Sequence, residues 1–137
     1  EGFYADPQLV AAAAITDSVA SVTSDQINRM HRAPGDRNAY AVVSRGRIQM
    51  ENFVSAMAFM EELAELATSV GGVETGIALP VTGDRYEAIF VQFAASMQEL
   101  QDLDEKLFAS EDYLAMFAKA SQYMESRFDS VFAQRII

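Results

Sequence analysis

Residues 71–83 read GGVETGIALPVTG and hold five of the ten glycine and proline residues in this chain of 137 residues. Long stretches with apolar residues at helical spacing lie on either side, and residues 84–137 contain neither glycine nor proline. Inside a helix, glycine costs about 1 kcal/mol and proline about 3 kcal/mol. The confinement of these residues therefore predicts long helices separated by glycine-rich breaks.

Four amphipathic helices are predicted, over residues 7–32, 37–70, 84–108 and 111–136. Asp6, Asp36 and Ser110 precede three of them and are residue types that cap helix N-termini. The pair Pro34-Gly35 and the pair Gly71-Gly72 are the expected stops of the first two helices. The break at Ser110 carries no glycine, so one continuous helix over residues 84–136 is the alternative.

Short connections between long amphipathic helices favour an all-α fold, an antiparallel up-down-up-down four-helix bundle. The length suits a single domain covering residues 1–137. Only Gly46 falls inside a periodic stretch. It indicates close helix packing, a kink, or a later start of the second helix.

The composition is acidic, with a formal net charge of −10 and no cysteine. Such a chain repels phosphates and anionic lipid surfaces, so neither nucleic acid nor a membrane is an expected partner. The absence of cysteine excludes thiol catalysis, disulfides and cysteine-ligated metals. No apolar run reaches the length of a membrane span. Because the sequence does not begin with methionine, we expect an extracytoplasmic protein, periplasmic or secreted.

Catalytic and metal-binding motifs are missing from the sequence. His31 is the only histidine, which excludes a di-iron carboxylate bundle and a serine–histidine–acid set. Its place at a predicted helix end favours a capping role over ligation. We therefore predict no enzyme activity, no catalytic residue, no metal and no cofactor.

A cluster of arginines is the most informative charged feature. Five of the ten basic residues fall within 19 positions, at Arg29, Arg32, Arg37, Arg45 and Arg47. In a bundle, this turn lies near the acidic turn at residues 102–112, and one interpretation is mutual neutralisation. The other is a pocket for an anion, because arginine pairs with oxyanions in a bidentate way. Ser121, on the apolar stripe of the last helix, either bonds its own backbone or offers a hydroxyl to a ligand.

A family resemblance lies in residues 117–124, FAKASQYM, and 132–134, FAQ. These stretches resemble the fourth helix of the Tar-type four-helix-bundle ligand-binding domain of bacterial chemoreceptors, and Leu79-Pro80 resembles its second loop. The family binds small ligands between helices at a dimer interface. The resemblance implies that Ser121 and Gln122 contact the ligand, together with Arg29 and Arg32, the only basic residues on the first helix.

The expected function is an extracytoplasmic sensory or binding module, non-catalytic, for a small anionic ligand in signal transduction. The alternative is a structural or interaction subunit of an assembly with no small-molecule ligand. In both cases we expect a homo-oligomer, a dimer or a larger assembly.

Overall fold

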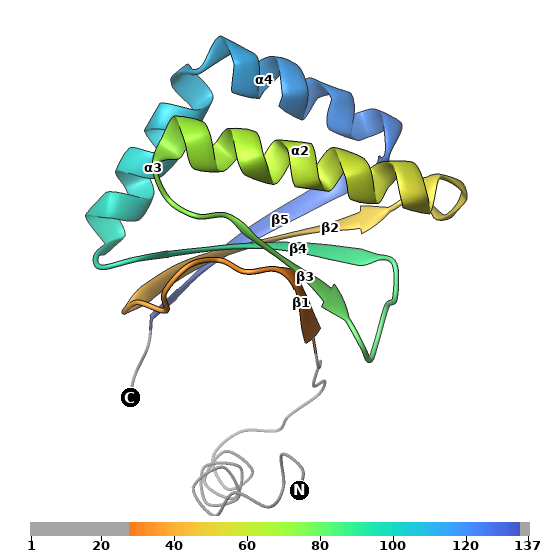
Figure 1. The fold of residues 1–137 in the computed structure, drawn as a ribbon, viewed down its shortest axis with the longest axis horizontal. Helices are drawn as coiled ribbons and strands as arrows, with labels where there is room; N and C mark the ends of the chain where they lie inside the picture. Colours follow the sequence, from red (N-terminus) through yellow and green to blue (C-terminus); the bar gives the residue numbers. More distant parts are fainter. Residues whose placement is uncertain (1–27, 135–137) are drawn as a thin grey trace, which may run out of the picture.

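The computed structural model describes residues 28–134 and shows an α+β fold (Figure 1). The elements in chain order are β1 (Asn28–Arg32), β2 (Tyr40–Ile48), η2 (Met50–Asn52), α2 (Phe53–Gly71), β3 (Gly76–Pro80), β4 (Glu87–Ala94), α3 (Met97–Ala109), α4 (Glu111–Ala118), η3 (Lys119–Gln122) and β5 (Met124–Gln134).

The described strands form one five-stranded sheet in the order β1-β3-β4-β2-β5, and every neighbouring pair is antiparallel. Strands β2 and β3 therefore run in the same direction with β4 between them, and α2 connects them. Strands β4 and β5 likewise run in the same direction on either side of β2, connected by α3 and α4. Two interleaved units of this kind make the split βαβ arrangement of ferredoxin-like folds.

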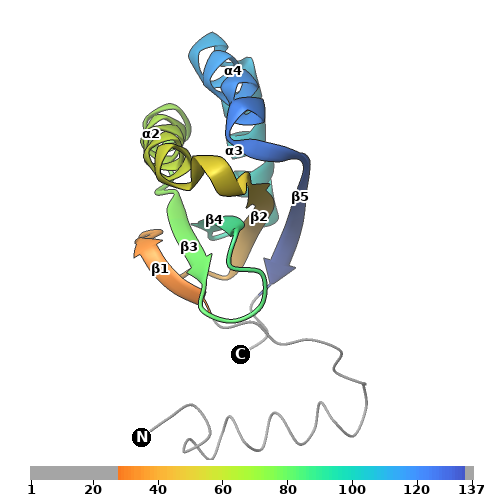
Figure 2. The same ribbon diagram turned by 90° about the vertical axis from the view of Figure 1, so that its right-hand side faces the viewer.

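The three α-helices of residues 28–134 lie on one face of the sheet (Figures 1 and 2). Helix α2 covers the β3 side, while α3 and α4 lie over β2 and β5 (Figure 2). The first core cluster joins α2 to the sheet through side chains such as Met60, Leu63, Ile48 and Ile77. A second cluster packs α3 against the sheet and α2 through Leu100, Leu103 and Leu107.

The predicted all-α bundle is wrong, because each of the four predicted helices contains a strand of the sheet. Residues 28–32 form β1, residues 40–48 form β2, residues 87–94 form β4 and residues 124–134 form β5. Each of these stretches pairs with a strand that is distant in the sequence, so pairing across the sheet overrides the helical spacing. The rest of the first predicted helix, with Asp6 and Pro7, lies outside the described residues.

Of the predicted helix stops, Gly71-Gly72 is confirmed, and so is the predicted cap at Ser110, whereas Pro34-Gly35 ends no helix because residues 28–32 form β1. Helix α2 ends before Gly72, which has a φ of 73° and donates its N–H to Thr68 O. Ser110 separates α3 from α4, and its hydroxyl accepts the backbone N–H of Tyr113. The loop predicted over residues 73–83 contains strand β3, and Asp36 precedes no helix. No helix in residues 28–134 has the length and apolar character needed to cross a membrane.

Candidate functional site

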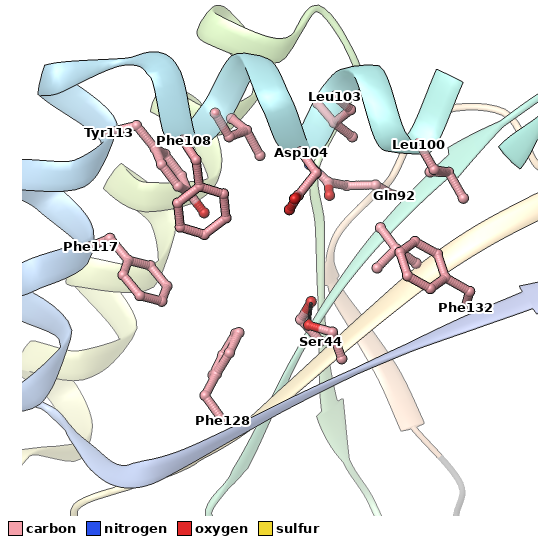
Figure 3. A pocket seen from close by; sticks show the side chains of 13 residues that line it. Ser44, Gln92, Leu100, Leu103, Asp104, Phe108, Tyr113, Phe117, Phe128 and Phe132 are labelled. Carbon is pink, nitrogen blue, oxygen red and sulfur yellow. Dashed lines mark hydrogen bonds between the residues drawn. The ribbon is translucent and has the colours of Figure 1, made fainter. Parts of the chain in front are cut away.

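A hollow of about 160 Å³ lies between the helix-covered face of the sheet and the pair α3–α4 (Figure 3). Side chains from β2, β4 and β5 form its floor, and side chains from both helices form its roof. The lining residues are Val42, Ser44, Gln92, Leu100, Leu103, Asp104, Leu107, Phe108, Tyr113, Phe117, Phe128, Ser130 and Phe132.

Strand periodicity and helix periodicity place these side chains together. On β5, Phe128, Ser130 and Phe132 alternate with residues of the opposite face, so all three point toward the helices. On α3, Asp104 and Phe108 are four residues apart and share the side that borders the hollow. The fold therefore builds one largely apolar lining from five elements, β2, β4, α3, α4 and β5.

Four aromatic rings gather along one side of the hollow (Figure 3). The ring of Phe108 lies 6.0 Å from that of Tyr113 and 6.1 Å from that of Phe117, both edge to face. Tyr113 stacks on Phe117 at 6.0 Å, and Phe117 meets Phe128 edge to face at 6.0 Å. These are favourable aromatic geometries, and they give the hollow a defined wall.

Few polar groups reach the hollow, and two of them bond each other. Ser44 Oγ and Ser130 Oγ lie 2.8 Å apart across the β2–β5 pair. Gln92 Nε2 donates to Thr75 Oγ1 at 2.8 Å. Asp104 forms neither a hydrogen bond nor an ion pair with any residue between 28 and 134. Asp104 is also the only charged residue among the described residues that line the hollow.

Tyr113 lies largely out of water beside this carboxylate. Burial raises the pKa of the Tyr113 hydroxyl above its ordinary value, and the negative charge of Asp104 raises that pKa further. The hydroxyl donates to no acceptor within the described part of the chain. It therefore enters the site as a neutral group that can still donate a hydrogen bond.

A second hollow of about 230 Å³ adjoins the first behind the Phe117–Phe128 ring pair. Leu63, Phe90, Met124, Ser121 and Glu125 are among the residues around it. Gly46 leaves the space that Met124 and Phe128 occupy here, because a Cβ at this position would collide with both side chains. The two hollows form an apolar groove under α3, α4 and η3.

The residues expected to bind an anion lie at two separate places. Arg29 and Arg32 belong to β1, at one edge of the sheet, whereas Ser121 and Gln122 belong to η3, which leads into β5 at the other edge. Ser121 lines the second hollow and donates its hydroxyl to Ala118 O at 3.3 Å. The fold does not bring the four residues together, and their role in binding remains a prediction.

Arg32 instead ties β1 to α2. Its Nε donates to Thr75 O at 3.0 Å, and its guanidinium lies 3.5 Å from Glu61 and 3.8 Å from Glu74. His31 Nε2 lies 2.9 Å from the same Glu61 carboxylate, which replaces the helix-capping role predicted for this histidine. Among residues 28–134, no three acidic or histidine side chains gather as a metal site would require.

Arg45 and Arg47 lie on the face of the sheet opposite α2, α3 and α4, whereas Arg37 lies between β1 and β2. Arg47 pairs with Asp84 at 2.7 Å and with Glu125, and Arg45 lies across from Asp129 in the β2–β5 register. Arg32 and Arg47 of the cluster therefore pair with acids, but not with the acidic turn at residues 102–112 that the bundle prediction placed beside the cluster. The arginines do not line the hollow.

The sequence did not predict the hollow, because its lining residues fall within stretches predicted to be helices of a bundle. One local signal was present: Phe128, Ser130 and Phe132 alternate with period two, which is typical of a strand. The spacing of Asp104 and Phe108 also placed a carboxylate and a ring on one helix face. Neither signal alone identifies a binding site.

Solved structures share this fold. An uncharacterised NIPSNAP domain protein from Burkholderia xenovorans matches with a TM-score of 0.59 and 14% identity, over 70% of this chain and 93% of that one. A NIPSNAP family protein from Agrobacterium tumefaciens matches with a TM-score of 0.61 and 17% identity, over 82% of this chain and 94% of that one. The fold is NIPSNAP-like.

A third match points to a related group with the same architecture. A Nitrosomonas europaea protein, to which antibiotic biosynthesis monooxygenase activity has been assigned as a proposal, matches with a TM-score of 0.54 and 11% identity. The match covers 72% of this chain and 99% of that one. At these identities the likeness concerns the fold alone. No protein-family model matches the chain, and no curated protein matches its sequence.

These neighbours overturn the resemblance to Tar-type chemoreceptor domains. Residues 117–124, which carried it, run through the end of α4 and through η3 into the first residue of β5, and residues 132–134 belong to β5. The prediction of an extracytoplasmic sensory module for a small anion, and its alternative of a ligand-free structural subunit, rested on the four-helix bundle and fall with it. The extracytoplasmic location remains an untested prediction.

Proposed function

We propose that this chain binds a small, largely apolar, ring-containing molecule in the hollow between the sheet and α3–α4. The observation that carries the proposal is the wall of four aromatic rings facing a floor with a single hydroxyl pair. Ligand sites are typically apolar, with a few placed polar groups that fix orientation. The volume of about 160 Å³ also suits one ring, since an apolar protein cavity of about 150 Å³ accepts benzene.

The polar groups give such a ligand an orientation. The Ser44–Ser130 pair uses one hydroxyl hydrogen internally, so the other hydroxyl hydrogen is free to reach a ligand acceptor. The neutral Tyr113 hydroxyl offers a second donor at the opposite wall. A ring with one polar substituent would satisfy this arrangement.

The test is titration of the ¹⁵N-labelled protein with small aromatic fragments, followed by NMR. Binding should shift amide signals of α3, α4 and β5 first. Ser44→Leu, which fills the floor, should abolish these shifts, whereas Val43→Leu adds bulk on the opposite face of the same strand and should leave them unchanged. Unchanged binding by a folded Ser44→Leu variant would contradict the proposal, and Phe117→Leu provides a second variant with the same expectation.

We also propose that the bound molecule is released without chemical conversion, in line with the sequence-based prediction that the chain is not an enzyme. Among the described lining residues, no histidine or lysine is available to take up a proton at neutral pH, and the two serines bond each other. Mass spectrometry of a bound fragment after prolonged incubation tests this. Because the Nitrosomonas europaea neighbour is described as a monooxygenase, oxygen uptake is measured in parallel. Protein-dependent turnover would reverse this part of the proposal.

We propose, finally, that the chain forms a homodimer through the face of the sheet that the described helices leave uncovered. Apolar side chains such as Val43, Val91 and Val131 lie on it, and Val131 is 57% exposed. The same face carries Arg45 and Asp129, so one patch can meet its own copy with opposite charges.

Light scattering across a concentration series measures the oligomeric state. Val131→Lys should yield monomers. Val54→Lys on α2 is the matched control, since Val54 is 83% exposed on the other side of the molecule. A wild-type protein that stays monomeric at all concentrations would contradict the dimer.

A further inference from the structure

The charged residues that line the two hollows are acidic, and none is basic. Asp104 is the single charged residue among its described lining residues, and Glu125 is the single one in the adjoining hollow. No arginine or lysine of residues 28–134 lines either space. Glu125 is neutralised by Arg47, whereas Asp104 has no cationic partner in this part of the chain. One uncompensated carboxylate therefore faces an aromatic cavity.

The ring nearest to Asp104 along α3 is Phe108, one helical turn further on. Both side chains border the hollow, and the Asp104 carboxylate reaches into it from α3 (Figure 3). The rings of Tyr113 and Phe117 extend the wall, with centroids 6.0 Å and 6.1 Å from that of Phe108. Aromatic faces attract cations, and sets of such rings are the recurrent means of recognising organic ammonium groups.

The electrostatic field of the whole chain also favours a cationic ligand. The formal net charge of −10 attracts cations and repels anions over the surface. Asp104 also acts electrostatically on the partly buried Tyr113 hydroxyl, so its charge acts on groups that line the hollow. An anionic ligand would meet repulsion there, and a neutral ligand would leave the carboxylate unpaired.

From these observations we infer that the hollow selects an organic cation, a primary or quaternary ammonium group on an apolar body. The ammonium group lies between the Asp104 carboxylate and the Phe108 ring, and the apolar body enters the space above Ser44 and Ser130. This inference rests on the proposed binding function and names the chemical class of the ligand.

Three probes of similar size but different charge test the inference: benzylammonium, benzyl alcohol and benzoate at neutral pH. NMR titration should give a dissociation constant for benzylammonium about fivefold lower than for benzyl alcohol, and benzoate should bind weakest. Added salt should reduce the advantage of the cation, because Asp104 is exposed to solvent.

Matched variants assign the preference to particular groups. Asp104→Asn keeps the shape and should reduce the preference for benzylammonium over benzyl alcohol. Asp102→Asn removes a carboxylate of the same helix that bonds Gln98 and does not line the hollow, so it should keep the preference. Phe108→Leu keeps an apolar side chain and should weaken the binding of benzylammonium about threefold more than that of benzyl alcohol.

The outcomes separate this inference from the binding function on which it rests. Equal binding of benzyl alcohol and benzylammonium to the wild-type protein would overturn the inference while the pocket is confirmed. An undiminished preference in Asp104→Asn would overturn it as well. Failure of all three probes to shift signals of the hollow would overturn both proposals.

Discussion

Gly46 on β2 lies opposite Phe128 on β5, and a Cβ built on the glycine would stand 2.8 Å from a carbon of the phenylalanine ring. The same Cβ would collide with the side chain of Met124. The missing side chain thus lets two β5 residues pack against the sheet. Phe128 then stands at the boundary between the two hollows, so this glycine shapes the proposed site without touching a ligand.

Gly46→Ala should destabilise the protein by about 1–3 kcal/mol, the usual cost of adding a group to a filled space. Urea unfolding measures this change. Phe128→Leu removes the ring atoms that the new methyl group would meet, so the double variant should lose less stability than the two single losses added together. Strict additivity would show that the contact does not limit this position.

The sequence predicted helix ends better than element types. The glycine pair at the end of α2 and the serine before α4 act through local hydrogen bonds, so a few residues of sequence are enough to predict them. Residues 124–134 are different, because Met124, Phe128 and Val131 fit a helical stripe, while Phe128, Ser130 and Phe132 fit an alternating strand. Pairing with β2, between 76 and 94 positions earlier, decides between them.

The proposed site was less predictable than the fold. Ser44 and Ser130 bond each other across 86 positions of sequence, and nothing near either serine indicates the other. Gly46 was a visible exception to the helix prediction, and it lies inside a strand, where isolated glycines mark close packing. The arginines stood out by number, but surface ion pairs account for Arg32 and Arg47.

Ser110→Ala should cost about 1 kcal/mol of stability, because the Ser110 hydroxyl accepts the Tyr113 N–H at the start of α4. Loss of this cap should also loosen the Phe108–Tyr113 ring contact across the α3–α4 corner. Chemical denaturation gives the first effect, and line widths of the Tyr113 signals give the second. Ser110→Asp keeps a capping oxygen and should retain wild-type stability, so an equal loss in both variants would argue against capping.

Asp84→Asn should make the protein less sensitive to acid. The Tyr86 backbone N–H and, second, the Arg47 guanidinium lower the pKa of Asp84 below its ordinary value of 3.8. The unfolded chain therefore takes up this proton first as the pH falls below 3.8, and stability is lost down through the lowered pKa of the folded state. Unfolding at a series of pH values should show a shallower acid loss in Asp84→Asn.

Two controls accompany the acid series. Arg47→Gln should reproduce only part of the Asp84→Asn effect, because the larger contribution from the Tyr86 N–H remains. Glu62→Gln changes an exposed carboxylate on α2 that pairs with no residue between 28 and 134, and it should leave the acid profile unchanged. A profile for Asp84→Asn that coincides with wild type would contradict the assignment.

Tyr113→Phe should reduce the loss of folding stability that the protein shows at high pH. Burial, and to a lesser extent Asp104, raise the pKa of Tyr113 above 10.0, so the unfolded chain releases this proton more readily than the folded one. The resulting contribution to stability is present below pH 10.0 and is lost as the pH rises through the raised pKa. Ultraviolet titration of wild type minus Tyr113→Phe isolates the transition of this residue. In Asp104→Asn the pKa of Tyr113 should fall yet stay above 10.0, because burial is the larger cause of the shift. A transition at 10.0 in the wild type would instead show that the hydroxyl lies in water and not against the hollow.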